Sequence, residues 1–222
     1  MKVEKFLYRP TKDFYITQLF GEDKVCILNS NNKTLVYKED FNKCPTGYRS
    51  LYSQMKGHNG IDVRTPRWLP MYALQNGWVP EVCTEEARGL GVGIVTNDQY
   101  YCEEINKETY FKYRMWHFIA LNVHEGDKVK TGQLVGWADS TGYSTGDHLH
   151  LEIKPVEISY DNSGKAWVRN ALQNNGYFGA IDPLPYMEPI FVLQVRDWNT
   201  LLRRIKEQVA RIADSISDLS RS

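Results

Sequence analysis

Short runs of β-branched and aromatic residues, separated by Gly, Asn, Asp and Pro, recur through most of this 222-residue chain. Such runs are typical of β-strands, and the residues between them are typical of turns. Few stretches before residue 196 show the 3.6-residue apolar spacing of a helix. The pattern predicts a mostly β protein, built on an antiparallel sheet or an open, barrel-like sheet, rather than an α/β protein. The expected strands are Val79–Val82, Gly91–Thr96, Tyr110–Asn122, Leu134–Ala138 and His148–Lys154.

The chain divides into a long body and a final segment of different character. Residues 1–195 are expected to form one domain, with two polar, turn-rich insertions at about residues 21–56 and 159–179. Loops of that length often carry function. In residues 196–222, apolar side chains alternate at spacings of four and three, which predicts an amphipathic helix. Oligomerisation and docking onto the chain's own domain are equally compatible with such a helix.

Composition argues against several classes of protein. The 27 Lys and Arg residues balance 27 Asp and Glu residues, so the formal net charge is zero. The charge therefore does not indicate nucleic acid or an anionic membrane as a partner. No apolar run is long enough to cross a bilayer, and the N-terminal sequence lacks the apolar core of a signal peptide. The four cysteines contain no Cys-x-x-Cys pair, so a thiolate metal site is not indicated. We expect four reduced thiols, with a Cys26–Cys44 bridge as the alternative.

One motif that suggests chemistry is His58-Asn59-Gly60-Ile61-Asp62. In an extended strand, residues four apart lie roughly 13 Å from each other. The donors to one zinc ion must instead converge on bonds of about 2.0–2.2 Å. Gly60 offers backbone angles that would fold His58 back towards Asp62.

A second motif, His148-Leu149-His150-Leu151-Glu152, alternates polar and apolar residues as a strand does. Both imidazoles are therefore expected on one face, roughly 6–7 Å apart. That spacing suits one ring that binds a metal and one that reaches a metal-bound water. Glu152 would either orient a ligand or lie on the surface. His117 offers a further imidazole on an expected strand, although a histidine in that setting is commonly a core residue, and His124 is expected in a surface turn.

Taken in order, these motifs resemble the lysostaphin-type (LytM-like) zinc endopeptidases of peptidoglycan. The resemblance extends from about Ile16 to Leu184, which is most of the chain. The segments that carry it are Ile16-Thr17-Gln18-Leu19-Phe20-Gly21, Gly57 to Val63, Pro70 to Val79, Tyr113 to Phe118, Glu125 to Gln133 and Ser140 to Ile153.

The resemblance implies a role for each residue of the site. His58, Asp62 and His150 would bind one Zn²⁺ per chain and leave a fourth position for water. His148 would be the general base that takes a proton from that water, and His117 would orient or stabilise the tetrahedral oxyanion. The implied reaction is hydrolysis of an amide in the stem peptide or cross-bridge of bacterial peptidoglycan.

The resemblance also sets expectations about the surroundings of the protein. The lack of a signal peptide predicts synthesis in the cytoplasm and fits a phage-encoded enzyme that reaches the wall through a lysis pore or as a virion component. The expected partners are peptidoglycan peptides, together with a second copy of the chain if the C-terminal helix pairs. The alternative to an enzyme is a catalytically silent LytM-like module for wall binding or assembly. Such a module would have lost a ligand, and none is lost here.

Overall fold

The computed structural model describes residues 3–22, 24–27, 35–37, 42–43, 55–144, 146–173 and 175–188. The predicted helix at residues 196–222, most of the insertion at 21–56 and the partner Cys44 of the possible disulfide lie outside these ranges. Two short 3₁₀ turns lie within these ranges, at Glu103–Ile105 and Leu184–Tyr186. No helix in this described part has the length and apolar character needed to cross a bilayer.

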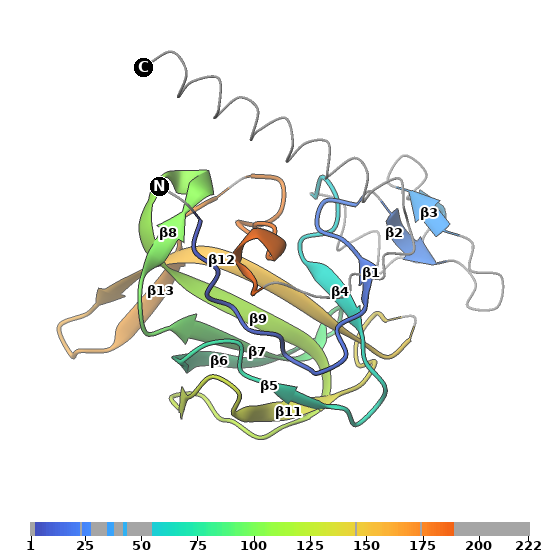
Figure 1. The fold of residues 1–222 in the computed structure, drawn as a ribbon, viewed down its shortest axis with the longest axis horizontal. Coiled ribbons are helices and arrows are strands. Elements are labelled where there is room, and N and C mark those ends of the chain that lie inside the picture. Colours follow the sequence, from blue (N-terminus) through green and yellow to red (C-terminus); the bar gives the residue numbers. More distant parts are fainter. Residues whose placement is uncertain are drawn as a thin grey trace, which may run out of the picture.

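An antiparallel sheet forms the framework of the fold (Figure 1). Its neighbouring strands run in the order β1 (Ile16–Gln18), β4 (Ile61–Arg64), β12 (His148–Tyr160), β9 (Lys107–Leu121), β7 (Gly89–Thr96), β6 (Gly77–Glu85) and β10 (Lys128–Val129). Four further strands join at the sides, namely β5 (Pro70–Tyr72), β8 (Tyr100–Cys102), β11 (Leu134–Ala138) and β13 (Ala166–Asn170). A separate pair consists of β2 (Lys24–Ile27) and β3 (Leu35–Tyr37). The predicted mostly β, antiparallel architecture is confirmed.

The predicted strands are all present, and most of them extend further than the sequence pattern indicated. Strand β11 has the predicted bounds, whereas β9 and β12 are longer. Strand β12 continues to Tyr160 and pairs there with β13, so the region around residues 159–179 contains a β-hairpin. His124 lies in an exposed turn, as expected. Cys83 and Cys102 are free thiols.

Alternation along the two central strands separates the side chains onto two faces of the sheet. Tyr113 and Met115 of β9, together with Leu149 and Leu151 of β12, are buried in the hydrophobic core. The intervening residues of β12 include His148, His150 and Glu152, which therefore point to the opposite face. Because the apolar side chains of β12 pack into the core on one face of the sheet, its polar side chains lie on the other face.

Candidate metal centre

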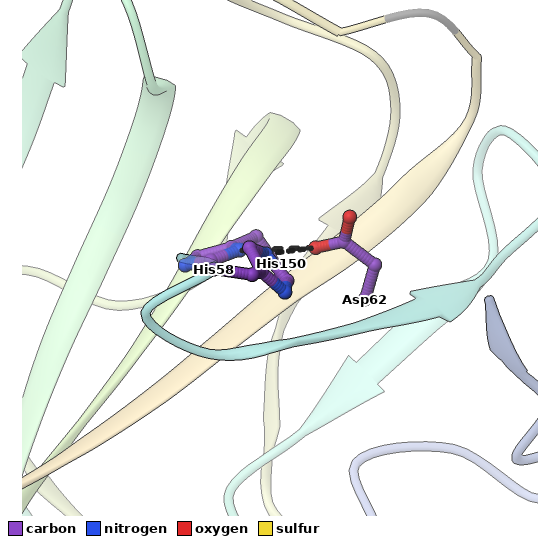
Figure 2. A group of neighbouring side chains, drawn as sticks. All are labelled: His58, Asp62 and His150. Carbon is purple, nitrogen blue, oxygen red and sulfur yellow. Dashed lines mark hydrogen bonds and ion pairs between the residues drawn. The ribbon is translucent and has the colours of Figure 1, made fainter. Parts of the chain in front are cut away.

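Three of the predicted site residues converge from two neighbouring strands and the loop that precedes one of them (Figure 2). His58 lies in the loop before β4, Asp62 lies on β4, and His150 lies on β12. Strands β4 and β12 are paired so that Asp62 and His150 are direct cross-strand partners. Side chains opposite each other in a sheet lie close together, and His58 reaches the same point from the loop. The sheet register therefore assembles the cluster.

The separations of the donor atoms fit a tetrahedral ion. His58 Nε2 lies 3.0 Å from His150 Nδ1, and Asp62 Oδ1 lies 3.0 Å from His150 Nδ1 and 3.2 Å from His58 Nε2. Tetrahedral zinc with bonds of about 2.0–2.1 Å requires donors about 3.3 Å apart. Two imidazoles and one carboxylate are also a donor set found in catalytic zinc sites. The residues present therefore fit the metal that the sequence resemblance implied.

The tautomer of His58 is set by the main chain beneath it. Its Nδ1 lies 3.2 Å from the carbonyl oxygen of Leu19, which can only accept a hydrogen bond. Nδ1 therefore carries the proton, and Nε2 keeps its lone pair directed at the cluster. Leu19 is a residue that sequence reasoning missed, because a main-chain carbonyl leaves no signature in the sequence.

The protonation states of the other two donors also suit a cation. Burial by itself would raise the pKa of Asp62, but the nearby imidazoles of His58, His148 and His150 bring it well below its ordinary value. Burial lowers the pKa of His150, against the opposing effect of its hydrogen bond with Asp62. The cluster therefore presents an ionised carboxylate and a neutral imidazole, which are the forms that bind metals.

Gly60 matters because it has no side chain, not because of unusual backbone angles. The sequence predicted that its conformational freedom folds His58 back towards Asp62, but its φ does not lie in the positive range. A Cβ at this position would instead lie 2.5 Å from the carbonyl oxygen of Leu151 and 2.8 Å from Cε1 of His150. Only glycine lets the loop lie directly against β12, and this close approach brings His58 to the cluster.

His148 lies beside the three donors. Its Nδ1 lies 2.8 Å from the carbonyl oxygen of Gly146 and 3.1 Å from the hydroxyl of Ser144. Because the carbonyl only accepts, Nδ1 carries the proton. Nε2 is then unprotonated, and it lies 3.7 Å from Oδ1 of Asp62. His148 thus presents a proton-accepting nitrogen to the cluster.

His117 reaches the same face through a β-bulge. The pairing of β9 with β7 steps from Gly91–Trp116 to Leu90–Phe118, so His117 is the extra residue, and its φ is 69°. Its ring lies 4.4 Å from that of His148, measured between centroids, and Nδ1 lies 2.6 Å from the carbonyl oxygen of Thr141. Burial, reinforced by the neighbouring His148, lowers the pKa of His117 to about 3. The ring is therefore neutral at ordinary pH.

Two further residues near the cluster are defined only by the structure. Glu152 is fully buried, so the surface position, one of the two alternatives drawn from the sequence, is wrong. It does not face a metal donor directly but accepts a hydrogen bond of 2.6 Å from the amide of Asn59. Asn59 was not singled out from the sequence, although its position next to His58 in the motif was the available signal.

A model of peptidase family M23 matches residues 56–162. Among curated proteins, the glycyl-glycine endopeptidase ALE-1 of Staphylococcus capitis is 31% identical over 134 residues, which make up 59% of this chain and 29% of that protein. Lysostaphin of Staphylococcus simulans is 31% identical over 134 residues, 58% of this chain and 24% of that protein. The peptidoglycan DD-endopeptidase ShyB of Vibrio cholerae is 34% identical over 104 residues, 45% of this chain and 22% of that protein.

The chain therefore spans less than a third of the length of these curated relatives. Among solved structures, the catalytic domain of lysostaphin from Staphylococcus simulans is 28% identical with a TM-score of 0.44, and the match covers 59% of this chain and 79% of that one. The matched range of the family model contains His58, Asp62, His117, His148 and His150. Residues 56–162, which carry the whole candidate centre, are therefore the part of the chain that is similar to peptidase family M23.

Proposed function

We propose that this chain is a zinc-dependent endopeptidase that hydrolyses an amide bond in the peptide part of bacterial peptidoglycan. The observation that carries the proposal is the triangle of donor atoms of His58, Asp62 and His150, with sides of 3.0–3.2 Å, within a segment that matches an M23 peptidase model. The names of the relatives support the substrate class, because they include a glycyl-glycine endopeptidase and a peptidoglycan DD-endopeptidase.

The proposed metal is one Zn²⁺ per chain, held by His58 Nε2, Asp62 Oδ1 and His150 Nδ1. When bound, the ion supplies a Lewis acid that acidifies a coordinated water and polarises the carbonyl of the scissile amide. Two neutral imidazoles and one carboxylate leave the site with a net positive charge, which favours the oxyanion that develops on the substrate.

His148 is the proposed general base. Its Nδ1–H donates to the carbonyl of Gly146, which holds the ring in the tautomer whose Nε2 accepts a proton. That Nε2 lies 3.7 Å from the Asp62 donor atom, so a water at the centre is within its reach. His148 therefore takes the proton of the attacking water and then delivers it to the leaving amine.

His117 is the proposed partner of the oxyanion. Because its Nδ1–H donates to the carbonyl of Thr141, its Nε2 must first take a proton from solvent before it donates to the substrate oxygen. Burial opposes the charged ring in the resting protein. Negative charge that develops beside the ring offsets this cost, so the protonated form is favoured when the tetrahedral intermediate forms.

The proposal is tested by wall lysis with the full chain. Purified protein is mixed with walls that have glycine bridges and with directly cross-linked walls, with and without a chelator, and with zinc restored after chelation. The expected result is a loss of turbidity that the chelator stops and zinc restores, with new amino termini found by mass spectrometry of the released fragments. If no wall type shows chelator-sensitive lysis, the catalytically silent binding or assembly module is the better account.

A further inference from the structure

Glu152 is a fully buried carboxylate that none of the proposed catalytic steps uses. Its two oxygens have different partners. Oε1 lies 2.9 Å from Nη1 of Arg114 and 3.6 Å from Nζ of Lys154, whereas Oε2 accepts the 2.6 Å hydrogen bond from Asn59 Nδ2. Because a buried carboxylate is costly unless both of its oxygens are satisfied, each of these partners limits where Glu152 can lie.

Arg114, which binds the carboxylate of Glu152, is itself held in place by its neighbours. Its guanidinium lies over the ring of Trp116, 4.5 Å from the centroid, and its Nε lies 3.0 Å from an oxygen of Glu81. The Trp116 ring lies against β7, since a Cβ on Gly91 would come within 2.1 Å of it. Contacts on the sheet thus determine the position of Arg114, and Arg114 in turn determines the position of Glu152 Oε1.

On the other side of Glu152, Asn59 belongs to the loop that carries the metal donor His58. Asn59 is buried and follows His58 directly. The main chain of His58 is held from the opposite side, because its N–H donates to Glu22 and its carbonyl accepts from the N–H of Gly21. The loop is therefore held between the segment around residues 21–22 and the carboxylate of Glu152.

We propose that Glu152 is a positioning residue that fixes the loop of His58 through Asn59 and thereby sets the affinity of the centre for zinc. This inference rests on the proposed function, because it assumes that the three donors hold the metal. A loop that relaxes away from β12 would carry His58 Nε2 out of the 3.0–3.2 Å triangle. Loss of a residue that orients a metal ligand typically lowers metal affinity roughly 10- to 100-fold.

The test measures zinc binding rather than activity. The variants are Asn59→Ala, Glu152→Gln and the double variant, each checked by circular dichroism for the native fold. Zinc affinity is measured by competition with a chromogenic chelator, and the visible absorption of the Co²⁺-loaded protein reports the coordination geometry. Glu157→Gln is the matched control, because Glu157 is a glutamate on the same strand that also pairs with two cations, Lys107 and Arg169, but with a side chain that is 40% exposed.

Each single variant is expected to bind zinc roughly 10- to 100-fold more weakly, with a changed Co²⁺ spectrum, while Glu157→Gln matches the parent. The double variant should bind zinc no more weakly than the single variant with the larger loss, because both changes act on the same contact between Asn59 and Glu152. If Glu152→Gln does not fold, Asn59→Ala decides, since it leaves the Glu152–Arg114 ion pair in place.

Three results overturn the inference while leaving the proposed function standing. They are folded variants with the zinc affinity of the parent, an equal loss in Glu157→Gln, and fully additive losses in the double variant. A parent protein that binds no zinc at all overturns the inference and the proposed function together.

Discussion

The two ends of strand β12 differ in character although polar residues recur along its whole length. At the first end, His150 and Glu152 are buried, with exposed fractions of 8% and 0%. At the second end, Glu157 lies at the surface and Tyr160 is 70% exposed. The loop around Asn59 and Gly60 covers the first end, whereas the second end pairs with the edge hairpin strand β13.

Glu152 and Glu157 show what this difference means. Each carboxylate has two cationic partners, and each has a pKa lowered to about 2. For Glu157, hydrogen bonds from Lys107 and Arg169 in solvent are the cause. For Glu152, burial alone would raise the pKa, and Lys154, Arg114 and Arg88 outweigh it. Equal pairing thus has unequal consequences, because only the buried carboxylate leaves an uncompensated charge when it or a partner is removed.

The largest expected effect is at the buried end of the strand. His150→Ala and Asp62→Ala should each abolish stoichiometric zinc and wall hydrolysis together, because two donors do not make a stable catalytic site. Arg169→Ala, at the exposed end, should keep both. Metal content by mass spectrometry and turbidity assays check this, and a metal content unchanged in both ligand variants would refute the assignment.

The next effect separates catalysis from metal binding at the same end. His148→Ala should retain zinc but lose about 10²- to 10⁴-fold in turnover, because it removes the proton-accepting Nε2 that lies 3.7 Å from the Asp62 donor atom. His117→Ala should retain zinc and lose about 10²- to 10³-fold, as expected for one oxyanion partner. Measured kcat with parallel metal analysis checks both, and full activity of His148→Ala would remove its role as base.

A smaller effect compares the two glutamates in stability. Glu152→Gln should lower the free energy of unfolding by about 3 kcal/mol, because Arg114 and Lys154 are left without their buried counter-charge. Glu157→Gln should leave the unfolding midpoint unchanged, since its partners remain hydrated. Urea denaturation of the metal-free proteins gives both values, and equal losses would show that burial does not distinguish the two ends.

The pH dependence of stability gives a further test of the comparison between Glu152 and Glu157. The pKa of Glu152 is about 2 in the folded protein and ordinarily 4.5, so its stabilisation is present above pH 4.5 and is lost as the pH falls towards 2. The melting temperature of the metal-free parent should therefore fall across that window. The fall should be less steep in Glu152→Gln, and identical slopes would contradict the lowered pKa.

The smallest expected effect concerns the support of His117. The hydroxyl of Thr141 accepts a hydrogen bond from the N–H of Leu90 and donates one to the carbonyl of Phe118. Thr141→Val removes both bonds and should cost about 1 kcal/mol in stability, with zinc affinity unchanged. A modest fall in kcat should accompany it, because the carbonyl of Thr141 holds His117. Thermal melts and steady-state kinetics measure the two effects, and an unchanged melting temperature would exclude a supporting role for the hydroxyl.

The strands and the motif from His148 to Glu152 were largely predictable, because the signals that carry them are local. Alternation along His148–Glu152 depends only on the two-residue period of a strand, and the structure keeps it. The bounds of β11 were likewise predicted as found. Sequence reasoning also placed His124 in a turn, because Gly and Asp follow it closely.

His117 was predicted to face the site, but strict alternation would have contradicted that placement. On a regular strand, His117 would share the core face with Met115, and Phe118 would leave the core. The bulge against β7 reverses this, so that Phe118 stays buried in the core while His117 faces His148. A bulge depends on how two strands pair, and no local pattern in β9 specifies it.

By itself, the sequence determined which side chains are available as donors and which of them share a face of one strand, because residue type and strand period are local properties. Only the tertiary structure decided that Asp62 lies opposite His150, 88 residues further along the chain, and that Gly60 lets the loop of His58 lie against β12. It also decided that Glu152 is buried beneath Asn59. The physical reason is that register, close approach and burial depend on contacts between distant segments, which form only when the sheet packs as a whole.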